Sequence, residues 1–67
     1  MTIEQKMARY ITDNGLKINF VAEKAGVPYQ RLQSALNGGR KIKTDEFLAT
    51  CAALEVDPYL FRADETA

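Results

Sequence analysis

The chain of 67 residues contains no histidine, no tryptophan and a single cysteine, Cys51. One cysteine excludes an internal disulfide, and without histidine a zinc site built from protein ligands alone is not expected. General acid–base catalysis at neutral pH also lacks its usual side chain. Because the sequence contains no recognisable catalytic pair, metal cluster or phosphate-binding loop, we expect a protein that is not an enzyme and holds no metal or cofactor.

Long apolar runs are also absent. No stretch approaches the roughly 20 residues needed to cross a bilayer, and the N-terminus lacks a signal-peptide pattern. We therefore expect a cytoplasmic protein. At 46% hydrophobic and 27% charged residues, the composition is typical of a globular domain. So short a chain predicts one domain over residues 1–67 with a small core and a frayed tail from about residue 62.

The charges cancel over the whole chain but are unevenly distributed. Between Lys17 and Lys43, six cations stand against one anion, Glu23, which gives a local balance of +5. Residues 44–67 carry one cation and six anions, a balance of −5. Such a split can offer a positive surface to phosphates at zero net charge. Chance asymmetry in a small domain is the alternative interpretation.

Two short helices are predicted within residues 19–39, which read NFVAEKAGVPYQRLQSALNGG. Gly26 is expected to end the first helix, because glycine adopts the left-handed conformation beyond a helix end without steric cost. Pro28 is expected at the first position of the second helix. Leu32, Ala35 and Leu36 then face the core, and the polar residues between them face outward.

The flanking segments predict further helices. Thr2 and Gln5 match a capping box, and a first helix with an apolar stripe should follow and end near Gly15. Thr44 is expected to cap a later helix, and Asp57 with Pro58 to begin a short final one. The stripe expected to fill the core from the later helix is Phe47, Leu48, Cys51 and Leu54. Cys51 is accordingly interpreted as a core residue, with a redox-sensing thiol as the alternative.

At Ala22, Gly26, Val27, Leu32 and Leu36-Asn37-Gly38 the chain resembles the Xre-type, lambda-repressor-like helix-turn-helix domains. The resemblance extends from about residue 3 to residue 61. It implies an all-α, compact bundle of about five short helices that binds operator DNA, usually as a symmetric dimer. The chain departs from the family pattern at Lys17-Ile18, where relatives often carry Thr-Gln, and at Phe20, where they often carry a polar residue.

Two kinds of DNA contact are expected, base contacts that the resemblance implies and phosphate contacts that the positions of the cations indicate. Gln30 and Gln33 are the best candidates for reading bases, because a glutamine amide can donate to and accept from an adenine edge. The expected base contacts are Tyr29, Gln30, Gln33, Ser34 and Asn37. The expected phosphate contacts are Lys17, Asn19, Arg31, Arg40, Lys41 and Lys43. As alternatives, Tyr29 closes the rim of the core, Arg31 has no role, and Ser34 and Asn37 only solvate the helix.

Two apolar features leave alternatives open. Phe20 either leans over the first helix or the end of the later one, or marks a partner surface. Tyr59, Leu60 and Phe61 cannot all face inward from one turn, so they form either a dimer patch or a hydrophobic lid.

We predict a sequence-specific double-stranded DNA-binding transcriptional regulator, a bacterial or phage repressor that reads the major groove with the helix at about 28–37 as a homodimer. The alternative is a protein-interaction module, antitoxin-like or adaptor, that uses the same fold.

Overall fold

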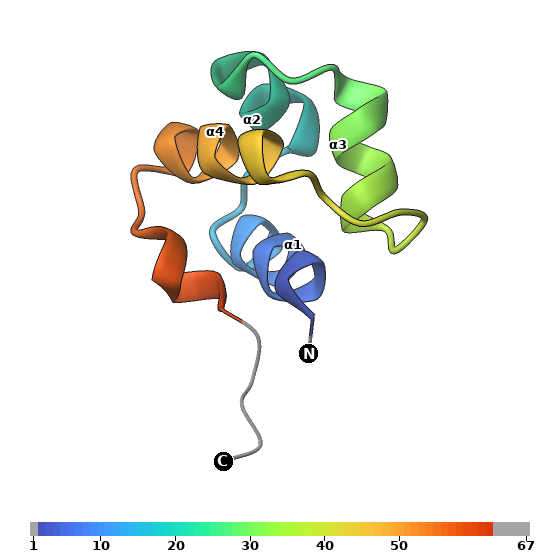
Figure 1. The fold of residues 1–67 in the computed structure, drawn as a ribbon. Helices are drawn as coiled ribbons and strands as arrows, with labels where there is room; N and C mark the ends of the chain where they lie inside the picture. Colours follow the sequence, from blue (N-terminus) through green and yellow to red (C-terminus); the bar gives the residue numbers. More distant parts are fainter. Residues whose placement is uncertain (1, 63–67) are drawn as a thin grey trace.

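The chain forms four α-helices and one 3-10 turn in the computed structural model, which describes residues 2–62 (Figure 1). The elements are α1 (Ile3–Asp13), α2 (Ile18–Ala25), α3 (Tyr29–Leu36), α4 (Thr44–Leu54) and the 3-10 turn η1 (Pro58–Phe61). No strand occurs within residues 2–62, so the expected all-α class is confirmed. The element expected as a fifth helix is the 3-10 turn. The predicted fraying concerns mainly residues 63–67, which lie outside the described part.

Helix α1 begins at a reciprocal cap and buries one apolar stripe. The Thr2 hydroxyl accepts a hydrogen bond from the Gln5 N–H at 3.1 Å, and the Thr2 N–H donates to the Gln5 side-chain oxygen at 2.9 Å. This capping box, predicted from the sequence, satisfies N–H groups that a helix start otherwise leaves without partners. Met7 and Ile11 are buried on the inner face of the helix.

The helices pack against one another in pairs. Helix α4 packs on α2, α3 packs on α1 and α2, and η1 packs on α1 and α4. Phe61 of η1 lies between α1 and α4, where its ring meets Tyr10 edge-on with centroids 5.5 Å apart and Phe47 with centroids 6.3 Å apart. Helix α3 is left at one edge of the molecule, on the side away from η1 (Figure 1).

All four α-helices end in the same way, with one residue in the left-handed conformation. These residues are Gly15 (φ +69°), Gly26 (φ +73°), Gly38 (φ +85°) and Glu55 (φ +59°). In each case the next residue donates its N–H to the carbonyl five positions back, as Val27 does to Ala22 at 3.0 Å. This is the Schellman motif, which satisfies carbonyls that the last turn leaves free. Only Glu55 adopts the conformation with a side chain.

The inner face of α4 differs from the predicted stripe. Leu48 is 49% exposed, so its assignment to the core is wrong, whereas Glu46 and Thr50 are buried. The Thr50 hydroxyl donates to the Glu46 carbonyl at 2.7 Å, which explains how a polar side chain is accommodated there. The helix begins at Thr44 itself, and Lys43 rather than Thr44 occupies the cap position.

Cys51 is buried on this face. Burial raises the pKa of its thiol, and the Asp57 carboxylate acts in the same direction. A thiol that stays protonated is a poor nucleophile and packs as a small apolar group. These observations favour the core interpretation over redox sensing.

Phe20 does not lean into the core. The residue is 56% exposed on α2, so the expectation that it covers α1 or the end of α4 is wrong. None of the described helices has the length and apolarity needed to cross a membrane.

Candidate nucleic-acid interface

The angle between α2 and α3 is fixed by the short connection at residues 26–28. Gly26 supplies the left-handed residue, and Val27 turns back into the core, where it is buried. Ala22 on α2 and Leu32 on α3 are each 1% exposed. The small alanine side chain allows the two helices to approach closely, and the leucine fills the space between them. The helix α3 therefore has a defined orientation on the body of the protein.

The outer face of α3 carries four of the five predicted base-contacting residues, and the fifth, Asn37, caps the end of the helix. Tyr29, Gln30, Ser34 and Asn37 are exposed and Gln33 is half-buried, whereas Leu32, Ala35 and Leu36 are buried on the opposite face. Tyr29 is not among the side chains that pack against the core, which argues against its role as a rim residue. The four side chains on the helix share one face because they recur at spacings of three and four.

The chain turns sharply after α3, close to Ser34. The Gly39 N–H donates to the Ser34 carbonyl at 2.8 Å. A Cβ atom at Gly39 would lie 3.0 Å from the Ser34 Oγ and 3.1 Å from its carbonyl oxygen. The absence of a side chain at Gly39 therefore lets the following loop begin directly against the outer face of α3.

The predicted phosphate-contacting lysines lie before α2 and after α3 in the chain. Lys17 occupies the cap position of α2, and Lys41 and Lys43 follow α3 in the loop of residues 37–43, which we call the basic loop. All three lysines are exposed and, within residues 2–62, none forms an ion pair with an acidic side chain. Asn19 is also exposed, and its side-chain oxygen accepts from the Phe20 N–H at 3.0 Å.

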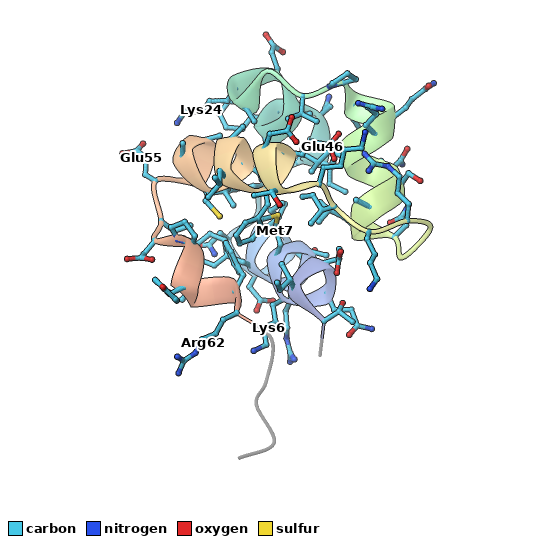
Figure 2. The ribbon with its side chains drawn as sticks, viewed as in Figure 1. Lys6, Met7, Lys24, Glu46, Glu55 and Arg62 are labelled. Carbon is cyan, nitrogen blue, oxygen red and sulfur yellow. The ribbon has the colours of Figure 1, made fainter. Side chains whose placement is uncertain are left out.

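The two predicted arginines are placed differently from the lysines. Nη2 of Arg40 donates to both carboxylate oxygens of the buried Glu46, at 3.0 and 3.1 Å. Arg31 Nη1 lies 3.5 Å from the same carboxylate (Figure 2 labels Glu46). The guanidinium of Arg40 is therefore turned toward the protein, while the Arg31 side chain remains 54% exposed. Both arginines therefore pair with Glu46, and Arg40 makes the shorter contacts and has the more buried side chain.

Glu46 is ionised at neutral pH. Burial alone would raise its pKa, but the Lys43 N–H, the hydrogen bonds from Arg40 and the charges of Arg40 and Arg31 together lower it. Glu4 behaves similarly, because a hydrogen bond from the Ile42 N–H lowers its pKa against an opposing effect of burial, with a further contribution from the charge of Lys41. Both carboxylates accept hydrogen bonds from the basic loop, a role that the sequence did not predict for either of them.

A signal for Glu46 exists in the sequence but is weak. Glu46, Thr50 and Cys51 recur at helical spacing, so a charged residue shares a helix face with core residues. Such a position requires a buried partner charge, and the nearest cations along the chain are in the basic loop. For Glu4 no comparable signal exists, since its contact with Ile42 spans 38 positions of the chain.

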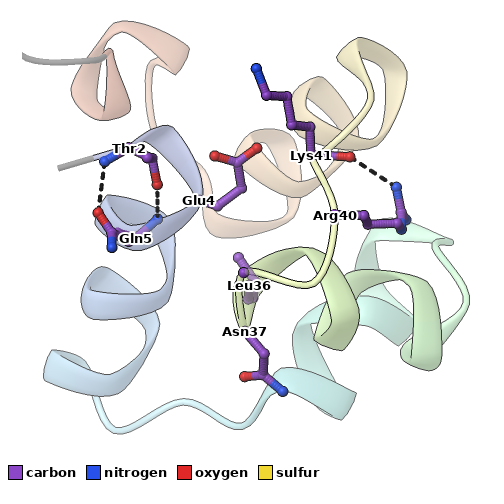
Figure 3. A pocket seen from close by; sticks show the side chains of 8 residues that line it. Thr2, Glu4, Gln5, Leu36, Asn37, Arg40 and Lys41 are labelled. Atoms are coloured by element: carbon purple, nitrogen blue, oxygen red, sulfur yellow. Dashed lines mark hydrogen bonds between the residues drawn. The ribbon is translucent and has the colours of Figure 1, made fainter.

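An open depression separates the start of α1 from the end of α3. Its volume is about 400 Å³, and Figure 3 shows Glu4 pointing from α1 toward the basic loop across it. Polar groups at its edge are already used locally, as in the pairs formed by Thr2 with Gln5 and by Arg40 with the Lys41 carbonyl (3.1 Å). Within residues 2–62, no group of three His, Cys, Asp or Glu residues is placed to hold a metal ion.

The predicted dimer residues divide between surface and core. Tyr59 is 76% exposed and Leu60 is 54% exposed, but Phe61 is 1% exposed and lies in the core. Phe61 is therefore not available to a partner, and that part of the prediction is corrected. Of the three predicted residues, Tyr59 and Leu60 are the ones exposed for a contact at η1.

The molecule is thus an all-helical protein with a polar face on α3 and exposed lysines before α2 and after α3. Comparisons with protein-family models, with curated proteins and with solved structures find no match to this chain. Its function must therefore be argued from its own geometry.

Proposed function

We propose that the protein is a sequence-specific double-stranded DNA-binding transcriptional regulator in which α2 and α3 form a helix-turn-helix. The observation that carries the proposal is the exposed polar face of α3, together with three exposed lysines before α2 and after α3 that form no ion pair with an acidic side chain within the described residues. An α-helix fits the major groove of B-DNA, and amides are suited to adenine edges. Lysines beside such a helix would meet the phosphates on either side of the groove.

The proposed contacts with DNA are of two kinds, to bases and to phosphates. Gln30 and Gln33 contact base edges, and Tyr29, Ser34 and Asn37 extend this contact along the groove. Lys17, Lys41 and Lys43 contact phosphates and supply affinity without sequence information. Asn19 and Arg31 are also exposed and remain candidates for phosphate contact.

We further propose that two copies bind together as a repressor in the cytoplasm, with the α3 helices in successive major grooves about 34 Å apart. Tyr59 and Leu60 are exposed on η1, on the side of the molecule away from α3 (Figure 1). They are the apolar residues that we assign to the contact between copies.

The experiment that tests the proposal selects duplexes from a randomised pool and titrates the enriched duplex against a shuffled one at two salt concentrations. A preference of about 10³ or more, with steep salt dependence, is expected of specific regulators. Gln30→Ala and Gln33→Ala should each cost about 1–3 kcal/mol on the enriched duplex and relax base preference. Thr12→Ala, at an exposed position of α1, is the control. Equal and weak binding to both duplexes would overturn the proposal.

A second candidate function is a protein-interaction module of the antitoxin or adaptor kind. The exposure of Phe20, Tyr59 and Leu60 favours it, because large apolar side chains on a small surface often mark a partner site. This candidate predicts a stable complex with another protein and DNA binding that is indifferent to sequence. Phe20→Ser should weaken that complex while leaving the affinity for DNA unchanged.

A further inference from the structure

Glu46 is a charged side chain in the interior of a small protein. Its side chain is 7% exposed, and it lies in the first turn of α4 (Figure 2). An ionised carboxylate is stable in such a place only when hydrogen-bond donors and positive charge surround it. The donors around Glu46 therefore show which segments the carboxylate holds together.

These donors come from separate parts of the chain. Arg40 contributes Nη2 from the basic loop, Lys43 contributes its backbone N–H at 3.2 Å from the end of that loop, and Arg31 approaches from α3 at 3.5 Å. Arg40 Nη2 also donates to the Arg31 carbonyl at 3.0 Å. One guanidinium thus links the first turns of α3 to the first turn of α4.

We propose that Glu46 and Arg40 form a clamp that positions the basic loop, so that Arg40 acts as a positioning residue while Lys41 and Lys43 meet phosphate. This inference rests on the proposed function and refines its assignment of Arg40. An arginine whose guanidinium is already engaged by a buried carboxylate gains little from a phosphate, since the carboxylate would lose its main partner.

The middle of the loop supports this division of roles. The Ile42 N–H donates to a Glu4 carboxylate oxygen at 2.9 Å, and the Ile42 side chain packs against the core. In an extended segment, alternate side chains point to opposite sides. Lys43 has extended backbone angles (φ −77°, ψ 155°), and both neighbours of the anchored Ile42, Lys41 and Lys43, are exposed.

The first arm of the test uses no DNA. Amide hydrogen exchange is measured for Ile42 and Lys43 in the wild type and in Glu46→Gln, Arg40→Gln and Arg40→Lys. In each variant the Lys43 amide hydrogen should exchange about tenfold faster or more. The reason is that its hydrogen bond to the charged Glu46 carboxylate is lost or weakened. Glu55→Gln, which removes the exposed pair with Lys24, is the matched control and should leave exchange unchanged. If Glu46→Gln does not fold, the two Arg40 variants decide the outcome.

The second arm measures DNA affinity against salt concentration. Lys41→Gln and Lys43→Gln should each reduce the slope of log K against log salt by about 0.9, as expected for one phosphate contact. Arg40→Gln should weaken binding about tenfold at every salt concentration with the slope preserved, and Lys24→Gln should change neither quantity. A preserved salt slope for Arg40→Gln, together with faster amide exchange in the basic loop, supports the clamp.

Two results would overturn the clamp. One is unchanged exchange at Ile42 and Lys43 in the folded Arg40 and Glu46 variants. The other is a loss of about 0.9 in the salt slope with Arg40→Gln, which would make Arg40 a phosphate ligand. Absence of DNA binding by the wild type would instead overturn the proposed function, and the exchange data would then decide by themselves whether the clamp exists.

Discussion

Arg40 and Glu46 are joined through a single nitrogen, Nη2, which lies 3.0 and 3.1 Å from the two carboxylate oxygens. The pair connects the loop after α3 to the first turn of α4. A buried ion pair of this kind adds little to stability when compared with an apolar pair, but it strongly penalises the loss of either partner. Its main consequence is therefore to fix one arrangement of the loop.

The first prediction concerns acid. The pKa of Glu46 is lowered in the folded protein from its usual value of 4.5, so its contribution to stability is fully present above pH 4.5 and is lost as the pH falls through the lowered pKa. Glu4 has a pKa shift in the same direction. We expect the free energy of unfolding to fall below pH 4.5, measured by denaturant titration at several pH values.

Glu46→Gln provides the comparison for this prediction. A glutamine does not titrate, so the variant should be less stable than the wild type at pH 7 and should lose less stability on acidification. Asp13→Asn, at an exposed residue of α1, is the control and should retain the wild-type pH dependence. Parallel pH profiles for the wild type and Glu46→Gln would contradict the assignment of the acid-sensitive group to Glu46.

The second prediction concerns Glu55, which ends α4 with φ +59° and ψ +44°. A residue with a side chain in this conformation costs about 1–2 kcal/mol, whereas glycine adopts it freely. Glycine also raises the entropy of the unfolded chain, which offsets about 0.4–1 kcal/mol. Glu55→Gly should therefore raise the melting temperature by a few degrees, roughly 2–6 °C for a domain of this size.

Glu55→Ala separates this effect from the loss of charge. Both variants remove the ion pair with Lys24, whose Nζ lies 3.5 Å from Glu55 Oε2 (Figure 2 labels both residues). Only glycine also removes the Cβ. Calorimetry should therefore rank Glu55→Gly above Glu55→Ala in melting temperature, and the reverse order would show that backbone strain at this position is negligible.

The third prediction contrasts two neighbours on η1. Phe61 is buried against the Tyr10 and Phe47 rings, so Phe61→Ala should cost about 3–5 kcal/mol. Leu60 is 54% exposed, and Leu60→Ala should cost far less. A domain of this size has a stability of only about 3–10 kcal/mol. Phe61→Ala is therefore expected to unfold partly or fully even without denaturant. Equal losses of unfolding free energy in Phe61→Ala and Leu60→Ala would mean that η1 does not pack as described.

The sequence predicted the helices well because local chemistry determines where they begin and end. Thr2 with Gln5 is a cap that needs no tertiary partner, and Gly15, Gly26 and Gly38 end their helices by their own conformational preference. The outer face of α3 followed directly from helical spacing. These features depend on residues within one turn of each other.

The sequence-based predictions were wrong where tertiary packing determines which side chains are buried. The stripe through Phe47 and Cys51 did not specify which neighbouring positions face inward, and the fold buries Glu46 and Thr50 while it exposes Leu48. An acidic residue in a first helical turn is ordinarily interpreted as a partner of the helix dipole. Its burial here depends on Arg40, which reaches Glu46 only because the loop closes over α4. Whether each candidate contact binds DNA stays a prediction.

The fourth prediction tests the close approach at the start of the basic loop. An alanine Cβ at Gly39 would meet both the Ser34 Oγ at 3.0 Å and the Ser34 carbonyl oxygen at 3.1 Å. That carbonyl is held by the Gly39 N–H, so it cannot move away without breaking the hydrogen bond. Gly39→Ala should therefore destabilise the protein by about 1–3 kcal/mol in denaturant titrations, as overpacking usually does.

Ser34→Ala distinguishes the two contacts at Gly39. Alone, it should change stability by less than about 0.5 kcal/mol, because Ser34 is exposed. Combined with Gly39→Ala, it removes the hydroxyl but keeps the carbonyl, so the double variant should recover only part of the loss. Full recovery would place the whole clash at the hydroxyl, and no recovery would place it at the backbone. A Gly39→Ala variant as stable as the wild type would show that the loop can leave α3 along another path.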